Sequence, residues 1–128
     1  MESEICTMDN KHILIVDDDI SMLKMLRMFL QDEFKVSVVD SGKLALEFVS
    51  KHIPDLILLD YLMPVLSGPE VLENLREKEE YKDIPVLFLT SVTDREKIVK
   101  CLSMNPKGYL VKPISREELL DKVRASVV

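Results

Sequence analysis

The sequence predicts an α/β fold, a doubly wound parallel sheet built from five strand–helix units, (βα)5. Short aliphatic segments alternate strictly with segments of helical periodicity, and this order is typical of parallel strands covered by helices on both faces. The central aliphatic segment, Leu56–Asp60, has no polar alternation and lies between Pro54 and Pro64. It therefore predicts a strand buried on both faces. Asp60 then stands at its carboxyl end, where open α/β sheets place their ligands.

The first half of the chain predicts two strand–helix units. His12–Val16 is aliphatic and β-branched, and the apolar positions from Ile20 onward recur at helical spacing, with Asp19 as the N-cap. The alternating segment at residues 34–39 is typical of a strand at or near the edge of a sheet. A turn follows it and caps a helix over residues 43–50.

The third and fourth units follow the central strand. Pro69 suits the first turn of a helix over residues 70–78. Residues 85–90 predict the fourth strand, and the capping box at residues 93–96 opens a fourth helix. Asn105 can adopt the left-handed conformation where that helix ends.

The fifth unit completes the domain. Pro113 stops a strand at residues 108–112, and a second capping box at residues 115–118 starts the last amphipathic helix. We expect residues 1–11 to form a polar leader and residues 12–128 to form one domain. No linker or low-complexity segment interrupts the pattern.

The composition is that of an ordinary globular domain. The chain has 128 residues, of which 47% are hydrophobic and 31% charged, which is enough to bury a core. The net charge of −6 argues against direct binding of nucleic acid, which needs a basic face. No apolar run approaches the roughly 18–20 residues that span a membrane. The polar, acidic N-terminus does not resemble a signal peptide, so we expect a cytoplasmic protein without a membrane partner.

Four of the five predicted strands end in a residue with useful chemistry. Asp17 and Asp18 follow the first strand, Asp60 ends the third, Thr90 ends the fourth and Lys112 ends the fifth. The carboxyl ends of parallel strands lie along one edge of a sheet. We therefore expect these side chains to lie close together.

The chemistry of such a group points to a cation and a phosphoryl group. Three neighbouring carboxylates repel one another and resist joint ionisation unless a divalent cation compensates them. All-oxygen ligands favour a hard ion, and few protein ligands with room for water favour Mg²⁺ over Ca²⁺. With Lys112 the ion forms a positive socket for a phosphoryl group, to which Thr90 can donate a hydrogen bond. Asp60 can then act as the nucleophile and form an aspartyl phosphate.

The sequence resembles the response-regulator receiver family, the phosphoacceptor half of two-component signalling, over about residues 12–127. Four segments in order carry the resemblance: Ile15-Val16-Asp17-Asp18-Asp19, Leu59-Asp60-Tyr61-Leu62-Met63-Pro64 with Gly68 following, Leu89-Thr90-Ser91, and Gly108-Tyr109-Leu110-Val111-Lys112-Pro113. The resemblance implies the flavodoxin-like strand order 2-1-3-4-5. It also implies that Asp60 accepts phosphate from a sensor histidine kinase or a histidine phosphotransfer protein.

The resemblance further implies the metal ligands. Asp18 and Asp60 would bind Mg²⁺ through their side chains, the Leu62 carbonyl would supply a third protein ligand, and Asp17 would act through water. The apolar side chains of Leu62 and Val92 would flank the path of an attacking water, and we expect them to slow self-dephosphorylation.

Thr90 and Tyr109 resemble the switch pair of the family. On phosphorylation Thr90 would swing toward the phosphoryl group and Tyr109 would move inward. This would remodel the face of the fourth helix, fifth strand and fifth helix, which would bind a downstream protein, an effector domain or, as a homodimer, a second copy.

Two alternatives remain. A phosphatase with an Asp nucleophile, of the haloacid dehalogenase type, needs an acid two residues after the nucleophile, and Leu62 stands there. A pseudo-receiver would bind proteins without ever carrying phosphate, and the intact set of acids, Thr90 and Lys112 argues against it. We therefore expect a self-phosphorylating and self-dephosphorylating switch that turns over no external substrate.

Overall fold

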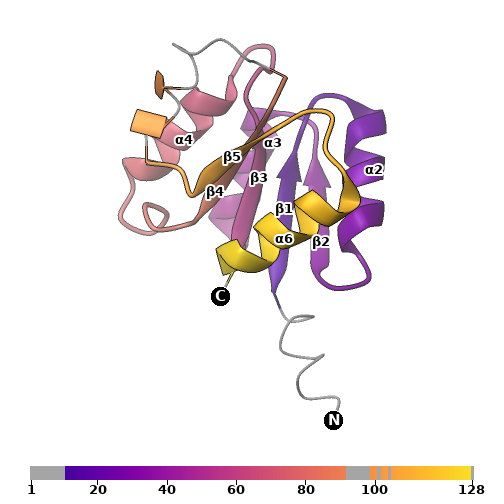
Figure 1. Ribbon diagram of the computed structural model, residues 1–128. Coiled ribbons are helices and arrows are strands. Elements are labelled where there is room, and N and C mark those ends of the chain that lie inside the picture. The colour runs from indigo at the N-terminus through magenta and orange to yellow at the C-terminus, as the bar shows by residue number, and fades with distance from the viewer. Residues whose placement is uncertain (1–10, 92–98, 101, 104, 128) are drawn as a thin grey trace.

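The computed structural model describes residues 11–91, 99–100, 102–103 and 105–127. Its core is a five-stranded parallel sheet in the order β2-β1-β3-β4-β5 (Figure 1), which confirms the predicted fold class and strand order. The strands are β1 (His12–Val16), β2 (Lys35–Val39), β3 (Leu56–Asp60), β4 (Val86–Thr90) and β5 (Gly108–Val111).

Helices cover both faces of this sheet, as the doubly wound prediction requires. The described helices are α2 (Ile20–Leu30), α3 (Gly42–Lys51), α4 (Gly68–Arg76) and α6 (Arg116–Val127). The helices α2 and α6 cover one face and α3 and α4 the other (Figure 1). Side chains of α2 and α6 pack in one buried cluster, and those of α3 and α4 pack in a second. None of these helices is long and apolar enough to cross a membrane.

The burial of the strands explains their sequence patterns. Every residue of β3 and β4 is buried, and their runs are accordingly apolar without alternation. The edge strand β2 is only partly buried, and its alternating pattern is the one that a half-exposed strand needs.

The caps predicted for the first two helices form at Asp19 and Ser41, and helix ends shift slightly. Asp19 accepts hydrogen bonds from two backbone N–H groups at the start of α2. Ser67 and Glu70 form a capping box, so α4 begins at Gly68, two residues earlier than predicted. The predicted capping box at residues 93–96 lies outside the described residues. Asn105 has the expected left-handed φ of 61°.

The register of the sheet determines which strand ends meet. Val16 lies level with Leu59, so that Asp17 follows β1 at the level of Asp60. Thr90 lies level with Val111 at the ends of β4 and β5. The carboxyl ends of four neighbouring strands therefore form one edge, which carries the predicted site residues.

Candidate functional site

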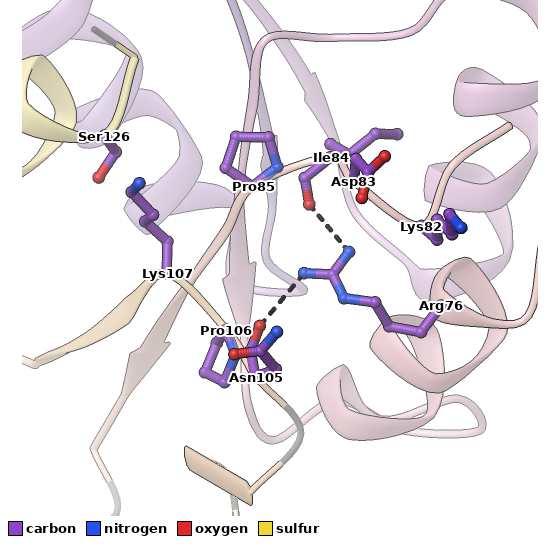
Figure 2. A pocket seen from close by; sticks show the side chains of 9 residues that line it. All are labelled: Arg76, Lys82, Asp83, Ile84, Pro85, Asn105, Pro106, Lys107 and Ser126. Atoms are coloured by element: carbon purple, nitrogen blue, oxygen red, sulfur yellow. Dashed lines mark hydrogen bonds between the residues drawn. The ribbon is translucent and has the colours of Figure 1, made fainter. Parts of the chain in front are cut away.

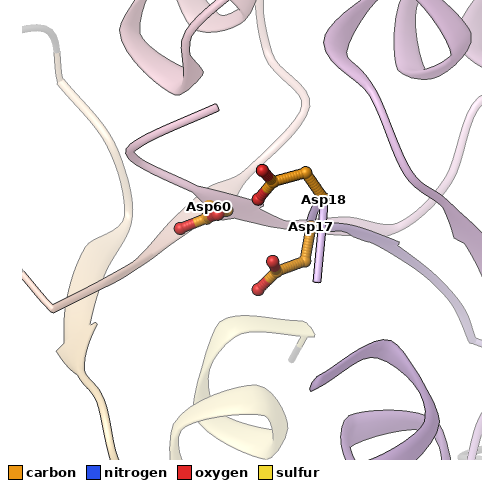
Figure 3. A group of neighbouring side chains, drawn as sticks. All are labelled: Asp17, Asp18 and Asp60. Carbon is orange, nitrogen blue, oxygen red and sulfur yellow. The ribbon is translucent and has the colours of Figure 1, made fainter. Parts of the chain in front are cut away.

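Three carboxylates meet at the carboxyl edge of the sheet. Asp17, Asp18 and Asp60 each offer an oxygen, and these oxygens all lie within 4.8 Å of one another (Figure 3). Asp17 and Asp60 are buried, whereas Asp18 is exposed to solvent. A cation could therefore approach from the solvent side and meet two buried carboxylates behind the exposed one.

Lys112 supplies the positive charge of this edge. Its Nζ lies 2.8 Å from Asp17 Oδ2 and 3.2 Å from Asp60 Oδ1, and its side chain is largely buried. Burial alone would lower the pKa of Lys112, but the hydrogen bonds and charges of Asp17 and Asp60 outweigh burial and raise it. Lys112 is therefore a fixed ammonium that bridges the ends of β1 and β3.

One lysine does not compensate three acids. Burial, and after it the charge of Asp17, raises the pKa of Asp60 from 3.8 to about 7, although Lys112 opposes both effects. Among the described residues, Lys112 is the cation that pairs with this group, so two negative charges remain uncompensated there when all three carboxylates are ionised. An all-carboxylate donor set with this excess charge fits a hard divalent cation such as Mg²⁺.

The other predicted site residues lie around this group. Thr90 is buried at the end of β4, and Tyr109 on β5 is half-buried and packs against the cluster on the α3 and α4 side. Leu62 lies on the loop after β3 with 52% of its surface exposed. Val92 lies outside the described residues.

Gly68 is a positioning residue whose role the sequence did not reveal. Its N–H donates to the Tyr61 carbonyl at 3.0 Å, and a Cβ at this position would overlap the Asp60 carbonyl oxygen. Only glycine therefore lets the first turn of α4 pack on the backbone of Asp60. In the sequence, Gly68 follows one of the segments that carry the family resemblance and lies in the predicted helix break at residues 67–69, but neither signal gave its role.

The loop between Asp60 and Gly68 contains a strained turn. Val65 has a φ of 69°, which is rare for a β-branched residue, and it is fully exposed. The N–H of Leu66 donates to the Pro64 carbonyl at 2.7 Å across this residue, which closes a three-residue turn. The turn reverses the chain directly beyond the carboxylate edge.

The comparisons with known proteins agree with this geometry. Residues 13–124 match the family of the response regulator receiver domain, and the chain belongs to that family. It is 37% identical over 115 residues to the sensor histidine kinase TmoS of Ectopseudomonas mendocina, a match that covers 90% of this chain and 12% of that protein. It is also 37% identical to the DNA-binding response regulator MtrA of Mycobacterium tuberculosis, over 90% of this chain and 50% of MtrA.

A solved structure of a response regulator has the same fold as this chain. The chemotaxis response regulator CheY4 of Vibrio cholerae superposes with a TM-score of 0.85 at 35% identity, over 91% of this chain and 98% of that one.

Receiver domains are signalling switches that bind Mg²⁺ at an acidic pocket and interact with histidine kinases and downstream effectors. The chain spans half or less of the TmoS and MtrA proteins that it matches.

Proposed function

We propose that this chain is the phosphoacceptor of a two-component phosphorelay, in which Asp60 takes a phosphoryl group from a histidine kinase or a histidine phosphotransfer protein. The observation that carries the proposal is the group of three carboxylates within 4.8 Å, with Lys112 bridging Asp17 and Asp60. Such a site can hold a cation and a phosphoryl group next to a buried carboxylate nucleophile.

In this proposal the acids have different roles toward Mg²⁺. Asp18 and Asp60 bind it through their side chains, and the Leu62 carbonyl is the third protein ligand. Asp17 acts through water, in keeping with its oxygens, which accept hydrogen bonds from a backbone N–H at 2.9 Å and from Lys112 at 2.8 Å. The bound ion would neutralise the oxygens of the transferring phosphoryl group.

The transfer itself needs few groups. An ionised oxygen of Asp60 forms the bond to phosphorus while the bond from phosphorus to the donor imidazole nitrogen breaks, and the electron pair of that bond leaves with the imidazole. The Lys112 ammonium stabilises the phosphoryl oxygens, and the Thr90 hydroxyl donates a hydrogen bond to one of them. Water later attacks the phosphorus and releases Asp60 and inorganic phosphate, so no external substrate is turned over.

Phosphorylation acts on partners through Thr90 and Tyr109. Thr90 moves toward the phosphoryl group, and Tyr109 moves further into the space behind it. In support, Tyr109 lies level with Phe88, two residues before Thr90 on the neighbouring strand. The change alters the face of the fourth helix, most of which lies outside the described residues, together with β5 and α6. This face binds a downstream protein, an effector domain or a second copy of the chain.

Leu62 and Val92 set the lifetime of the phosphorylated state by restricting the attacking water. In support, Leu62 follows Asp60 by two residues and its side chain is exposed. Leu62→Asn is expected to shorten the lifetime of the aspartyl phosphate. An unchanged lifetime in that variant would contradict the tuning role and leave the phosphoacceptor role untouched.

Intact-mass measurement after incubation with acetyl phosphate tests the proposal. We expect one phosphoryl adduct in the native chain with Mg²⁺, and none without Mg²⁺ or in Asp60→Asn. A chain that gains no adduct is next titrated with beryllofluoride and Mg²⁺, which imitate the phosphoryl group. Failure to bind them as well would refute the proposal in favour of a phosphorylation-independent interaction module.

A further inference from the structure

A polar cavity of about 350 Å³ lies at the edge of the sheet opposite to the carboxylates. It lies at the amino ends of β4 and β5, beside the last turn of α4, and its lining includes Arg76, Asp83 and Lys107 (Figure 2). Open α/β sheets place their ligands at the carboxyl ends of the strands, so the fold does not account for this cavity. It is also separate from every residue of the phosphoacceptor site.

Arg76 reaches into the cavity, and no carboxylate of the described residues lies at hydrogen-bond distance from it. Its Nη1 donates to the Ile84 carbonyl at 2.9 Å and its Nη2 to the Asn105 carbonyl at 3.4 Å, as Figure 2 shows. A guanidinium has five N–H donors, and the remaining three have no acceptor within the described part of the chain. Burial lowers the pKa of Arg76, and the charge of Asp83 offsets this only in part. The backbone carbonyls thus hold the guanidinium in place and leave its charge available.

The cavity is basic in an acidic protein. Its lining contains three basic side chains, Arg76, Lys82 and Lys107, and one carboxylate, Asp83. The whole chain, in contrast, has a net charge of −6. Lys82 pairs with Glu79 at 2.9 Å, which leaves the excess positive charge on Arg76 and Lys107. Lys107 is exposed and has no ion pair among the described residues. In Figure 2 its side chain lines the cavity but points away from Arg76, toward Ser126.

We propose that this cavity binds a small anionic molecule whose phosphate or carboxylate group accepts hydrogen bonds from the Arg76 guanidinium, while the exposed, flexible side chain of Lys107 turns its ammonium toward the same group. A planar guanidinium with free N–H donors suits the paired oxygens of either group, and an ammonium adds a second point charge. The volume lies at the lower end of small-molecule pockets, about 300–1,000 Å³. It therefore suits an anion that carries a small body rather than a macromolecule. The inference is independent of the phosphoacceptor function.

Residue-resolved NMR titration tests this site. The uniformly ¹⁵N-labelled chain is titrated at constant ionic strength, without Mg²⁺, with inorganic phosphate in one series and citrate in another. We expect saturable shifts of the Ile84 and Lys107 amides and of the Arg76 Nε–H. The anion with the stronger saturable response identifies the preferred group, a phosphate or a polycarboxylate.

Charge-removing variants make the test specific. Lys107→Gln and Arg76→Gln are each expected to weaken binding about fivefold or more, because each removes a charge-assisted contact. Lys24→Gln, which removes an exposed lysine of α2, is the matched control and should bind like the native chain. Lys107→Gln keeps the test valid if Arg76→Gln fails to fold. Shifts that do not saturate, that are equal in all variants, or that occur only around Lys112 would overturn the proposal.

Discussion

Replacement of Asp60 by Asn is expected to stabilise the metal-free protein at alkaline pH. The pKa of Asp60 rises from 3.8 to about 7 in the folded chain. Each pKa unit corresponds to about 1.4 kcal/mol, so ionised Asp60 disfavours the folded state by as much as about 4 kcal/mol. Asn keeps the shape of the side chain, removes its charge and leaves the ion pair between Lys112 and Asp17 in place.

The pH dependence gives this prediction its sign. Because the pKa of Asp60 is higher in the folded than in the unfolded chain, the folded chain binds more protons between about pH 4 and pH 7. The stabilisation by protonated Asp60 is fully present below pH 4 and is lost as the pH rises toward 7. Asp60→Asn should therefore match the native chain near pH 4 and exceed its free energy of unfolding by the largest amount near pH 8.

Urea unfolding in the presence of a chelator measures this difference. Asp32→Asn, which changes an exposed carboxylate after α2, is the control and should follow the native chain at every pH. Added Mg²⁺ should stabilise the native chain, by about 2.7 kcal/mol at a concentration of 100 times the Kd, and stabilise Asp60→Asn less. If Asp60→Asn were no more stable than the native chain at pH 8, the assignment of the uncompensated charge to Asp60 would be wrong.

Three further predictions concern single residues outside the carboxylate group. Arg124 donates to both carboxylate oxygens of Glu33 at 2.7 Å and lowers the pKa of Glu33, so Glu33→Gln should slightly lower the urea midpoint at pH 7, and this difference should disappear as the pH falls through the lowered pKa of Glu33. Val65→Asn should raise the free energy of unfolding by about 1 kcal/mol, because Asn tolerates the left-handed φ; an unchanged urea midpoint would contradict the strain. Gly68→Ala should lower the free energy of unfolding by about 2–3 kcal/mol, since its Cβ would overlap the Asp60 carbonyl; unfolding like the native chain would show that α4 can shift freely.

The fold could be predicted from the sequence because burial determines the patterns directly. A strand such as β3, buried at every position, needs an unbroken apolar run, and five such signals alternating with helical periodicity leave few topologies. The grouping of Asp17, Asp60 and Lys112 followed from the rule that parallel strands end on one edge. For these residues, the position at the end of a predicted strand in the sequence also gives the position at the carboxyl edge of the sheet.

The features that the sequence did not reveal depend on contacts between distant residues. The need for glycine at position 68 arises from the closeness of the Asp60 carbonyl, which no local pattern encodes. The hydrogen bond from Arg76 to the Asn105 carbonyl joins residues 29 positions apart. The local sequence does not predict it, because an arginine near the end of a helix is typical of a solvent-exposed side chain. Such features became visible only when the elements were assembled.

The charge balance at the carboxylate edge explains why a lysine alone does not complete the site. Lys112 compensates one of three carboxylates, and the raised pKa of Asp60 means that a proton can compensate a second near neutral pH. A proton on Asp60, however, occupies the oxygen that would have to act as nucleophile. A divalent cation would remove both uncompensated charges and favour the ionised carboxylate at the same time. The uncompensated negative charge therefore favours metal binding, and the reactivity of Asp60 depends on the bound metal.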